Sequence, residues 1–89
     1  MSIPMAKMRK QIDTIDKKII DLLEDRMRVV KNIGDFKKIN NIEPLDPARW
    51  QEVLATRVAM GISAKLSEEL ITTIWTSIHE EALRIEKKE

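Results

Sequence analysis

The stretch that decides the fold is residues 8–36, which read MRKQIDTIDKKIIDLLEDRMRVVKNIGDF. Its apolar residues recur at alternating steps of four and three, a heptad-like pattern typical of an amphipathic α-helix. The stripe consists of Met8, Ile12, Ile15, Ile19, Leu22, Arg26, Val29, Ile33 and Phe36. One helix from about residue 5 to about residue 39 would span roughly 50 Å, so it needs packing partners along its whole length.

A glycine lies inside this pattern, at Gly34, and the pattern ends at Asn40 and Asn41. Glycine in a helix interior costs roughly 1 kcal/mol relative to alanine. We therefore interpret Gly34 as a place where a neighbouring element comes close, rather than as a break in the helix.

A second helix is expected after the asparagines. Asp46 followed by Pro47 is a typical helix start, because the carboxylate caps free N–H groups and proline suits the first turn. The helix should run from Pro47 to about Met60 and end at Gly61, since glycine commonly terminates helices.

A third helix is expected to begin after Ser67, whose hydroxyl would cap it. Its apolar stripe is Ile71, Ile74, Ile78, Ala82 and Ile85. No segment shows the alternation of a β-strand. The predicted fold is therefore all-α, with three helices of which one is very long.

Length and composition predict how this fold becomes stable. The 89 residues fit one domain, residues 1–89, and include no cysteine to cross-link a small core. Because 43% of the residues are hydrophobic, burial against a second copy is expected, which predicts a homodimer. With one histidine and no cysteine, no zinc site is expected, and we predict no metal or other cofactor.

The charge balance bears on partners and location. Sixteen Lys and Arg residues against fifteen Asp and Glu residues leave a net charge of +1, which argues against nucleic-acid binding. The N-terminus has no apolar run of signal-peptide length, and no stretch approaches the roughly 20 apolar residues of a membrane span. We expect a cytoplasmic protein without a nucleic-acid or membrane partner.

Arg26 is the unusual member of the long stripe, because Ile or Leu would be expected there. Either its guanidinium extends to solvent or pairs with an acid in the bundle, or it is buried without a carboxylate and binds an anion. Lys37 returns to within about 20° of the same helical face, although a cation also suits the C-terminal end of a helix.

Two further arginines have the same two interpretations. Arg49, in the first turn of the second helix, is either a surface residue or an anion ligand. Arg9 lies some 25 Å from Arg26 along a straight helix, so the two cannot hold one small ligand within a single chain. An antiparallel second copy could bring them together.

Five segments, in order and with consistent spacing, carry a resemblance. They are residues 8–16 (MRKQIDTID), 22–27 (LLEDRM), 33–37 (IGDFK), 46–49 (DPAR) and 78–81 (IHEE). Over nearly its whole length the chain resembles the all-helical, AroQ-type chorismate mutase family. The pair Arg49-Trp50 and the last segment look most like the mutase domain fused to a 3-deoxy-7-phosphoheptulonate synthase, so a fused or associated synthase is an expected partner.

The resemblance implies the chorismate mutase type II fold, an intertwined homodimer with antiparallel long helices and two shared sites. It implies rearrangement of chorismate to prephenate in phenylalanine and tyrosine biosynthesis. Arg26, Lys37 and Arg49 match the family's positions that bind the substrate carboxylates and the ether oxygen, with Lys37 at that oxygen. Arg9 matches the arginine contributed by the other protomer, and Asp46 matches a contact near the ring hydroxyl.

Three positions depart from the family pattern. Trp50 stands where the best-studied members have a glutamate, Ala82 where they have a serine, and Glu86 where most have a glutamine. Ala82 and Glu86 are four residues apart, so both are expected to reach the substrate from one helical face. With Lys37 and Arg26, Glu86 is an expected catalytic residue. His79 is expected to be structural or to lie at the rim.

Other functions remain open at this point. The scaffold also suits an isochorismate-pyruvate lyase or an aminodeoxychorismate mutase, and Trp50 and Ala82 leave both possible. A non-catalytic helical dimerisation or regulatory module of a synthase is an alternative from a different class. A generic coiled-coil adaptor is the weakest alternative, because it gives no reason for Arg26 and Lys37 to share a face.

Overall fold

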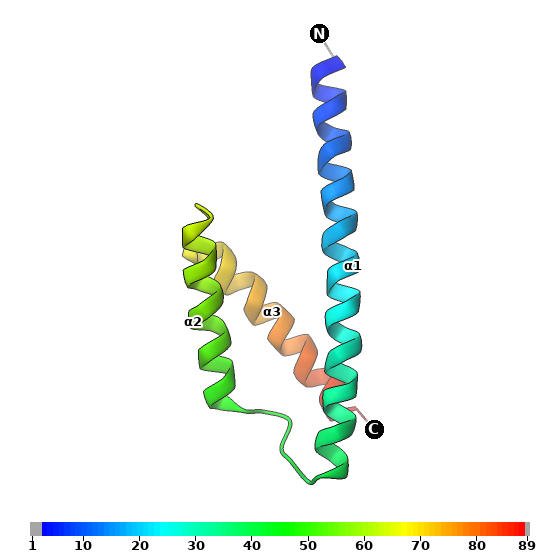
Figure 1. Ribbon diagram of the computed structural model, residues 1–89, viewed down its shortest axis with the longest axis vertical. Coiled ribbons are helices and arrows are strands. Elements are labelled where there is room, and N and C mark those ends of the chain that lie inside the picture. Colours follow the sequence, from blue (N-terminus) through cyan, green and yellow to red (C-terminus); the bar gives the residue numbers. More distant parts are fainter. Residues whose placement is uncertain (1–2, 89) are drawn as a thin grey trace.

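The computed structural model describes residues 3–88 and contains three helices, α1 (Ile3–Ile39), α2 (Pro47–Ser63) and α3 (Glu68–Lys87) (Figure 1). No strand occurs in this part of the chain. The prediction of an all-α fold with one very long helix is confirmed.

The helices form an open, elongated arrangement. The chain turns at the end of α1, α2 runs back alongside it, and α3 crosses diagonally between them (Figure 1). α3 packs against both other helices, whereas α1 and α2 make no direct backbone contact within residues 3–88. The radius of gyration is 16.8 Å, well above the value of about 12 Å for a compact chain of this length.

Asparagine residues end α1 as predicted. Asn41 has a φ of 55°, in the left-handed region that asparagine tolerates better than most residues. Its N–H donates to the Lys38 carbonyl at 3.3 Å, and the N–H of Ile42 donates to the Lys37 carbonyl at 2.8 Å. These two bonds form a Schellman motif, which satisfies carbonyl groups at the helix end.

The predicted starts of α2 and α3 are confirmed. Asp46 is the N-cap of α2, and its Oδ1 accepts a hydrogen bond of 3.1 Å from the Arg49 N–H. Pro47 occupies the first helical position. Ser67 caps α3, with its hydroxyl accepting from the Leu70 N–H at 3.1 Å.

The predicted end of α2 at Gly61 is wrong, because the helix continues to Ser63. The turn is made instead by Lys65, whose φ is 64°. Its N–H donates to the Ile62 carbonyl at 2.9 Å, and the N–H of Leu66 donates to the Gly61 carbonyl at 2.9 Å. Gly61 is buried, and a Cβ there would lie 2.4 Å from Cγ1 of Ile71 on α3. Its smallness therefore serves helix packing rather than helix termination.

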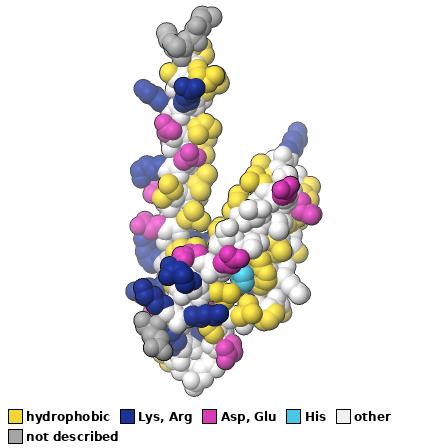
Figure 2. All heavy atoms as spheres, turned by 180° about the vertical axis from the view of Figure 1, so that it is seen from behind, with side chains coloured by type: hydrophobic (Ala, Val, Ile, Leu, Met, Phe, Trp, Pro, Cys, Tyr) yellow, Lys and Arg dark blue, Asp and Glu magenta, His cyan; other side chains and the backbone are white. Residues whose placement is uncertain are grey.

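The hydrophobic core within one chain is small. Its buried apolar residues are Val30, Val53, Ile71, Ile78 and Ala82, and no side chain among the described residues is less than 2% exposed. Much of the stripe on α1 stays in solvent, since Met8, Ile12, Ile15 and Ile19 are 50% to 55% exposed. Figure 2 shows hydrophobic side chains along the edge of α1 that faces the other helices, with charged ones along the opposite edge.

Within residues 3–88, none of the helices combines the length and the apolar character needed to cross a bilayer.

Candidate active site

A cavity of about 500 Å³ lies between the three helices. α1 forms one wall, α2 and the preceding loop form a second wall, and α3 forms the floor. Six residues expected from the sequence to form the site line it: Arg26, Lys37, Asp46, Arg49, Ala82 and Glu86. The helical register explains the grouping, because these positions repeat at steps of three or four along each helix.

An ion pair between two helices lies in the cavity lining. Lys37 Nζ on α1 lies 2.7 Å from Glu86 Oε1 on α3, and it also donates to the Pro44 carbonyl at 2.6 Å. The Lys37 side chain is 18% exposed and that of Glu86 only 10%. An ammonium group has three N–H donors, so one donor of Lys37 is left for a ligand.

Gly34 allows this ion pair to form. A Cβ at Gly34 would lie 3.0 Å from the Glu86 Cα and 3.4 Å from its Cγ. α3 therefore passes α1 so closely that a Cβ would be crowded at this position, one turn before Lys37. This confirms the prediction that Gly34 marks the approach of a neighbour.

Arg26 is half-buried in the wall formed by α1, about three turns from Lys37. Within residues 3–88, no carboxylate oxygen lies within 4.0 Å of its guanidinium. Burial lowers the pKa of Arg26, and the positive charges of Arg57 and Arg49 lower it further. The group is still cationic at neutral pH, so the cavity carries a partly desolvated positive charge that a bound anion would stabilise.

Arg49 and Asp46 lie at the start of α2, where the first turn faces the cavity. Both are exposed, and the Arg49 guanidinium forms an ion pair with Glu52 one turn along the helix. The carboxylate of Asp46 accepts from the Arg49 backbone. The cap thus fixes the turn, while the Arg49 side chain is long enough to exchange its surface partner for a ligand.

One face of α3 forms the floor of the cavity, through Trp75, His79, Ala82, Leu83 and Glu86. Ala82 and Glu86 lie on this face together, as their spacing predicted, and both are buried. A hydroxyl at position 82 would point into the same space, so alanine makes this part of the floor apolar.

Two aromatic features of the cavity were not found by sequence reasoning. The Trp50 and His79 rings stack with centroids 4.0 Å apart and an interplanar angle of 10°, which joins α2 to α3. Trp75 also lines the cavity, and its Nε1 is buried without a hydrogen-bond partner among the described residues. The sequence signal was the spacing 75-79-82-86 on α3, which places Trp75 and His79 on the same helical face as Glu86.

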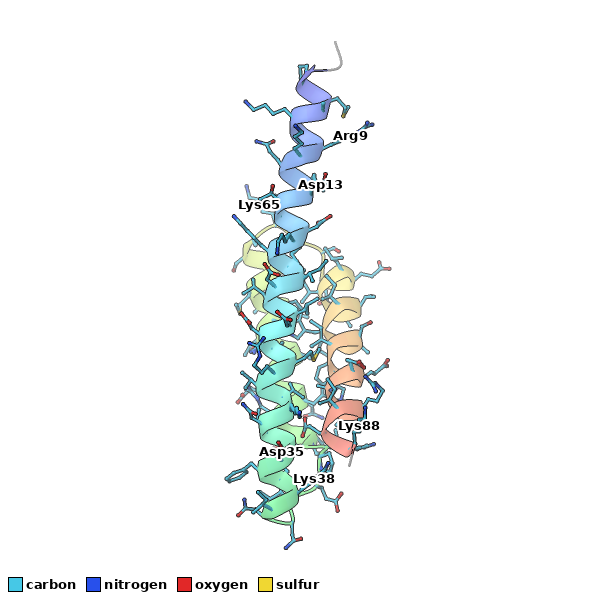
Figure 3. All side chains as sticks on the ribbon, turned by 90° about the vertical axis from the view of Figure 1, so that its right-hand side faces the viewer. Arg9, Asp13, Asp35, Lys38, Lys65 and Lys88 are labelled. Carbon is cyan, nitrogen blue, oxygen red and sulfur yellow. The ribbon has the colours of Figure 1, made fainter. Side chains whose placement is uncertain are left out.

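Arg9 lies outside this cavity. It is on the segment of α1 that extends past α2 and α3, as Figure 3 shows. Within one chain the structure therefore does not bring Arg9 to Arg26, in agreement with the distance along a single helix.

No group of three or more His, Cys, Asp or Glu side chains within residues 3–88 is placed to hold a metal ion. The cavity instead combines guanidinium and ammonium groups with apolar and aromatic walls. Such a site can bind a small carboxylate-bearing molecule with an unsaturated ring.

Comparison with known proteins gives the family. The model of chorismate mutase type II matches residues 8–87. The bifunctional chorismate mutase/prephenate dehydratase of Buchnera aphidicola (subsp. Acyrthosiphon pisum) is 35% identical over 80 residues, which are 90% of this chain and 21% of that protein. The T-protein of Enterobacter agglomerans is 30% identical over 74 residues, or 79% of this chain and 20% of that protein.

A third relative carries a name with a different substrate. The 4-amino-4-deoxychorismate mutase of Streptomyces pristinaespiralis is 22% identical over 83 residues, covering 93% of this chain and 64% of that protein. By contrast, the chain spans only about a fifth of the length of the Buchnera and Enterobacter relatives. Since the family match extends over nearly all of its residues, the chain belongs to the chorismate mutase type II family.

Proposed function

We propose that this chain is a chorismate mutase, which rearranges chorismate to prephenate for the biosynthesis of phenylalanine and tyrosine. The observation that carries the proposal is the half-buried Arg26, which lacks a carboxylate partner among residues 3–88 and shares a cavity with Lys37 and Arg49. Family membership supports the same reaction.

The reaction suits a site built from cations. In this intramolecular Claisen rearrangement the ether C–O bond breaks while a new C–C bond forms within the same molecule. It needs no proton transfer, nucleophile or metal. The enolpyruvyl side chain must be held over the ring, and negative charge grows on the ether oxygen as the bond breaks. Catalysis therefore requires orientation and a preorganised positive charge.

Each cation has a proposed role. Arg26 and Arg49 bind the two carboxylates and select the compact conformer. The remaining N–H donor of Lys37 points to the ether oxygen, where it stabilises the transition state more than the ground state. Asp46 is proposed to contact the ring hydroxyl, and Ala82 packs against the substrate from the floor.

Glu86 has a role that depends on its protonation. As a carboxylate it neutralises part of the charge of Lys37 and repels an oxyanion. As a carboxylic acid it can donate a hydrogen bond to the ether oxygen instead. We propose that the protonated form is the more active one.

The proposed assembly is an intertwined homodimer in which Arg9 of one protomer completes the site of the other. Three properties of the single chain support it: the exposed apolar stripe of α1, the elongated shape, and a core without a fully buried side chain among the described residues. The surface left uncovered on α1 extends over several turns, as a long antiparallel helix pair requires.

The domain organisation and the fusion partner are also proposals. We propose that residues 1–89 act as one mutase domain in the cytoplasm. A synthase partner was predicted, whereas the bifunctional relative named above joins its mutase to a prephenate dehydratase. Both arrangements would place the mutase next to an enzyme of the same biosynthetic route, and fusion to a synthase stays a prediction.

The second candidate function is a mutase that acts on an amino-substituted relative of chorismate. The match to a 4-amino-4-deoxychorismate mutase and the presence of Trp50 where a glutamate is expected favour testing an amino-substituted ring. An isochorismate-pyruvate lyase and a non-catalytic module of a synthase are the further alternatives. Incubation of the purified protein with each substrate separates them, since only one should be consumed at a high rate.

The decisive experiment follows chorismate disappearance with wild-type protein and with Arg26→Ala. We expect turnover by the wild type and a fall in kcat/KM of at least about 100-fold in the variant, because a buried carboxylate would lose its charged partner. A folded wild-type dimer without turnover of any of the three substrates would favour the non-catalytic module instead.

A further inference from the structure

Arg57 is a fourth cation near the cavity, and no comparison or family feature described above gives it a role. It lies on α2, one turn beyond Val53, which is the last residue of α2 in the cavity wall. Positions 49, 53 and 57 follow one another at steps of four, so Arg57 continues the cavity-facing side of α2.

Helix geometry places Arg57 level with Arg26. At the base of the cavity, Lys37 Nζ on α1 bonds to the Pro44 carbonyl just before α2, and α2 then runs back alongside α1. Arg26 precedes Lys37 by eleven residues and Arg57 follows Asp46 by eleven residues. Eleven helical residues span about 16 Å, so both arginines lie about three turns toward the same end of the cavity, where the charge of Arg57 lowers the pKa of Arg26.

The environment of Arg57 resembles that of Arg26. Its side chain is half-buried, and within residues 3–88 no carboxylate lies within 4.0 Å of it. Its Nη1 donates only to the hydroxyl of the adjacent Thr56, at 2.9 Å. The effect of Arg57 on the pKa of Arg26 is larger than that of Arg49, as expected if Arg57 is the nearer of the two.

Two like charges near each other at a partly dry site repel, and a planar anion between them converts the repulsion into attraction. Each guanidinium can offer two parallel N–H groups to a carboxylate. We propose that Arg57 and Arg26 together hold one carboxylate of the substrate, which makes Arg57 a binding residue of the site. This inference rests on the proposed function, because that function supplies the dicarboxylate.

The alternative partner for Arg57 is an acidic side chain of a second copy, and this alternative gives a different prediction. If Arg57 paired with an acidic side chain of a second copy, it would stabilise the dimer and leave substrate affinity unchanged. Dimer dissociation and substrate affinity must therefore be measured on the same variants.

The experiment compares Arg57→Gln with Arg28→Gln. Arg28 is an exposed arginine of α1 that pairs with Glu24 and Asp25 outside the cavity, so it is a matched control for loss of one positive charge. We expect Arg57→Gln to raise the KM for chorismate about 10- to 100-fold with kcat changed less than about threefold, because the contact exists in both the ground and the transition state. Arg57→Lys keeps the charge but loses the paired N–H donors. Its KM for chorismate should therefore lie between those of the wild type and Arg57→Gln.

A double-mutant cycle tests whether the two arginines hold the same group. If Arg26 and Arg57 hold one carboxylate, the double Gln variant should lose less affinity than the product of the two single losses. Losses that multiply would overturn the shared-carboxylate assignment. An Arg57→Gln variant with a KM within about twofold of the control, or with weaker dimerisation instead, would overturn the binding role.

Calorimetric titration with chorismate separates this inference from the proposed function. If the wild type binds chorismate without converting it, the proposed function fails, and a weaker Kd for Arg57→Gln still supports the binding role. If the wild type converts chorismate and Arg57→Gln binds it as tightly as the control does, only the inference on Arg57 fails. If the wild type does not bind chorismate, both are overturned.

Discussion

Gly34 on α1 and Glu86 on α3 are in contact, since a Cβ added to Gly34 would lie 3.0 Å from the Glu86 Cα. The atom that blocks the Cβ belongs to the backbone, so it cannot move aside as a flexible side chain can. The same approach brings Glu86 to within 2.7 Å of Lys37. Packing and proposed catalysis therefore depend on one crossing of two helices.

We expect Gly34→Ala to lower both stability and activity. Alanine contributes about 1 kcal/mol through helix propensity, but crowding against a packed backbone costs roughly 1–3 kcal/mol. The net effect should be a loss of about 1 kcal/mol in the free energy of unfolding, measured by urea titration at fixed protein concentration. Displacement of α3 by a fraction of an ångström should lower kcat roughly tenfold.

The control is Gly61→Ala, which crowds a different pair of helices. Its Cβ would lie 2.4 Å from Cγ1 of Ile71, a buried side chain that does not line the cavity. We expect a loss of about 2 kcal/mol in the free energy of unfolding with kcat of the folded protein unchanged. Equal effects of the two variants on kcat would mean that the Gly34 contact has no special relation to the site.

Mixing two inactive variants tests the shared site. Arg9→Ala and Arg26→Ala should each lose at least about 100-fold in kcat/KM. After the two are unfolded and refolded together, each mixed dimer would contain one intact site and one doubly altered site. About a quarter of wild-type activity should return if half of the dimers are mixed. Failure to recover activity, with mixed dimers present by native mass spectrometry, would contradict the contribution of Arg9 from the second copy.

The pH–rate profile tests Glu86. If the protonated carboxyl is the more active form, kcat should rise as the pH falls, and Glu86→Gln should flatten the profile, because the amide donates a hydrogen bond at every pH. His79 lines the same cavity, so its variants must be profiled as a control. A profile that Glu86→Gln leaves unaltered would remove Glu86 from the mechanism.

The Trp50–His79 stack predicts a structural role for His79. Replacement by phenylalanine keeps an aromatic ring against Trp50, whereas alanine removes about 0.5–1.5 kcal/mol of pair interaction. We expect His79→Phe to keep kcat/KM within about threefold and His79→Ala to lower the urea midpoint. If folded His79→Phe instead loses far more than threefold in kcat/KM, the ring nitrogens must act on the substrate.

The features predicted correctly from the sequence are those set by local chemistry. Asp46 with Pro47 and the hydroxyl of Ser67 are short-range capping signals, so the starts of α2 and α3 could be read directly. The stripe on α1 follows from a repeat that no tertiary contact is needed to explain. Six residues that the family resemblance implied for the site line one cavity, and their role there stays a prediction.

The errors and omissions involve contacts between helices. Gly61 was assigned to the end of α2 because glycine often occurs there, yet its role is set by Ile71 ten residues later. Lys65 has the positive φ that ends α2, and a lysine in the sequence does not predict a positive φ. Arg57 was missed because its proximity to Arg26 depends on how α2 runs alongside α1, and no spacing within one helix shows that.

The N-terminal part of α1 projects beyond α2 and α3, so no other element among residues 3–88 supports it (Figure 1). Isolated helical turns are only marginally stable in water. The N-terminal part of α1, called the arm below, is therefore stabilised as a helix only when another surface packs against it. On the proposed dimer, folding and association are then one equilibrium. The temperature of thermal unfolding should rise with protein concentration, and specific activity should fall on extreme dilution as the arm loses its cover.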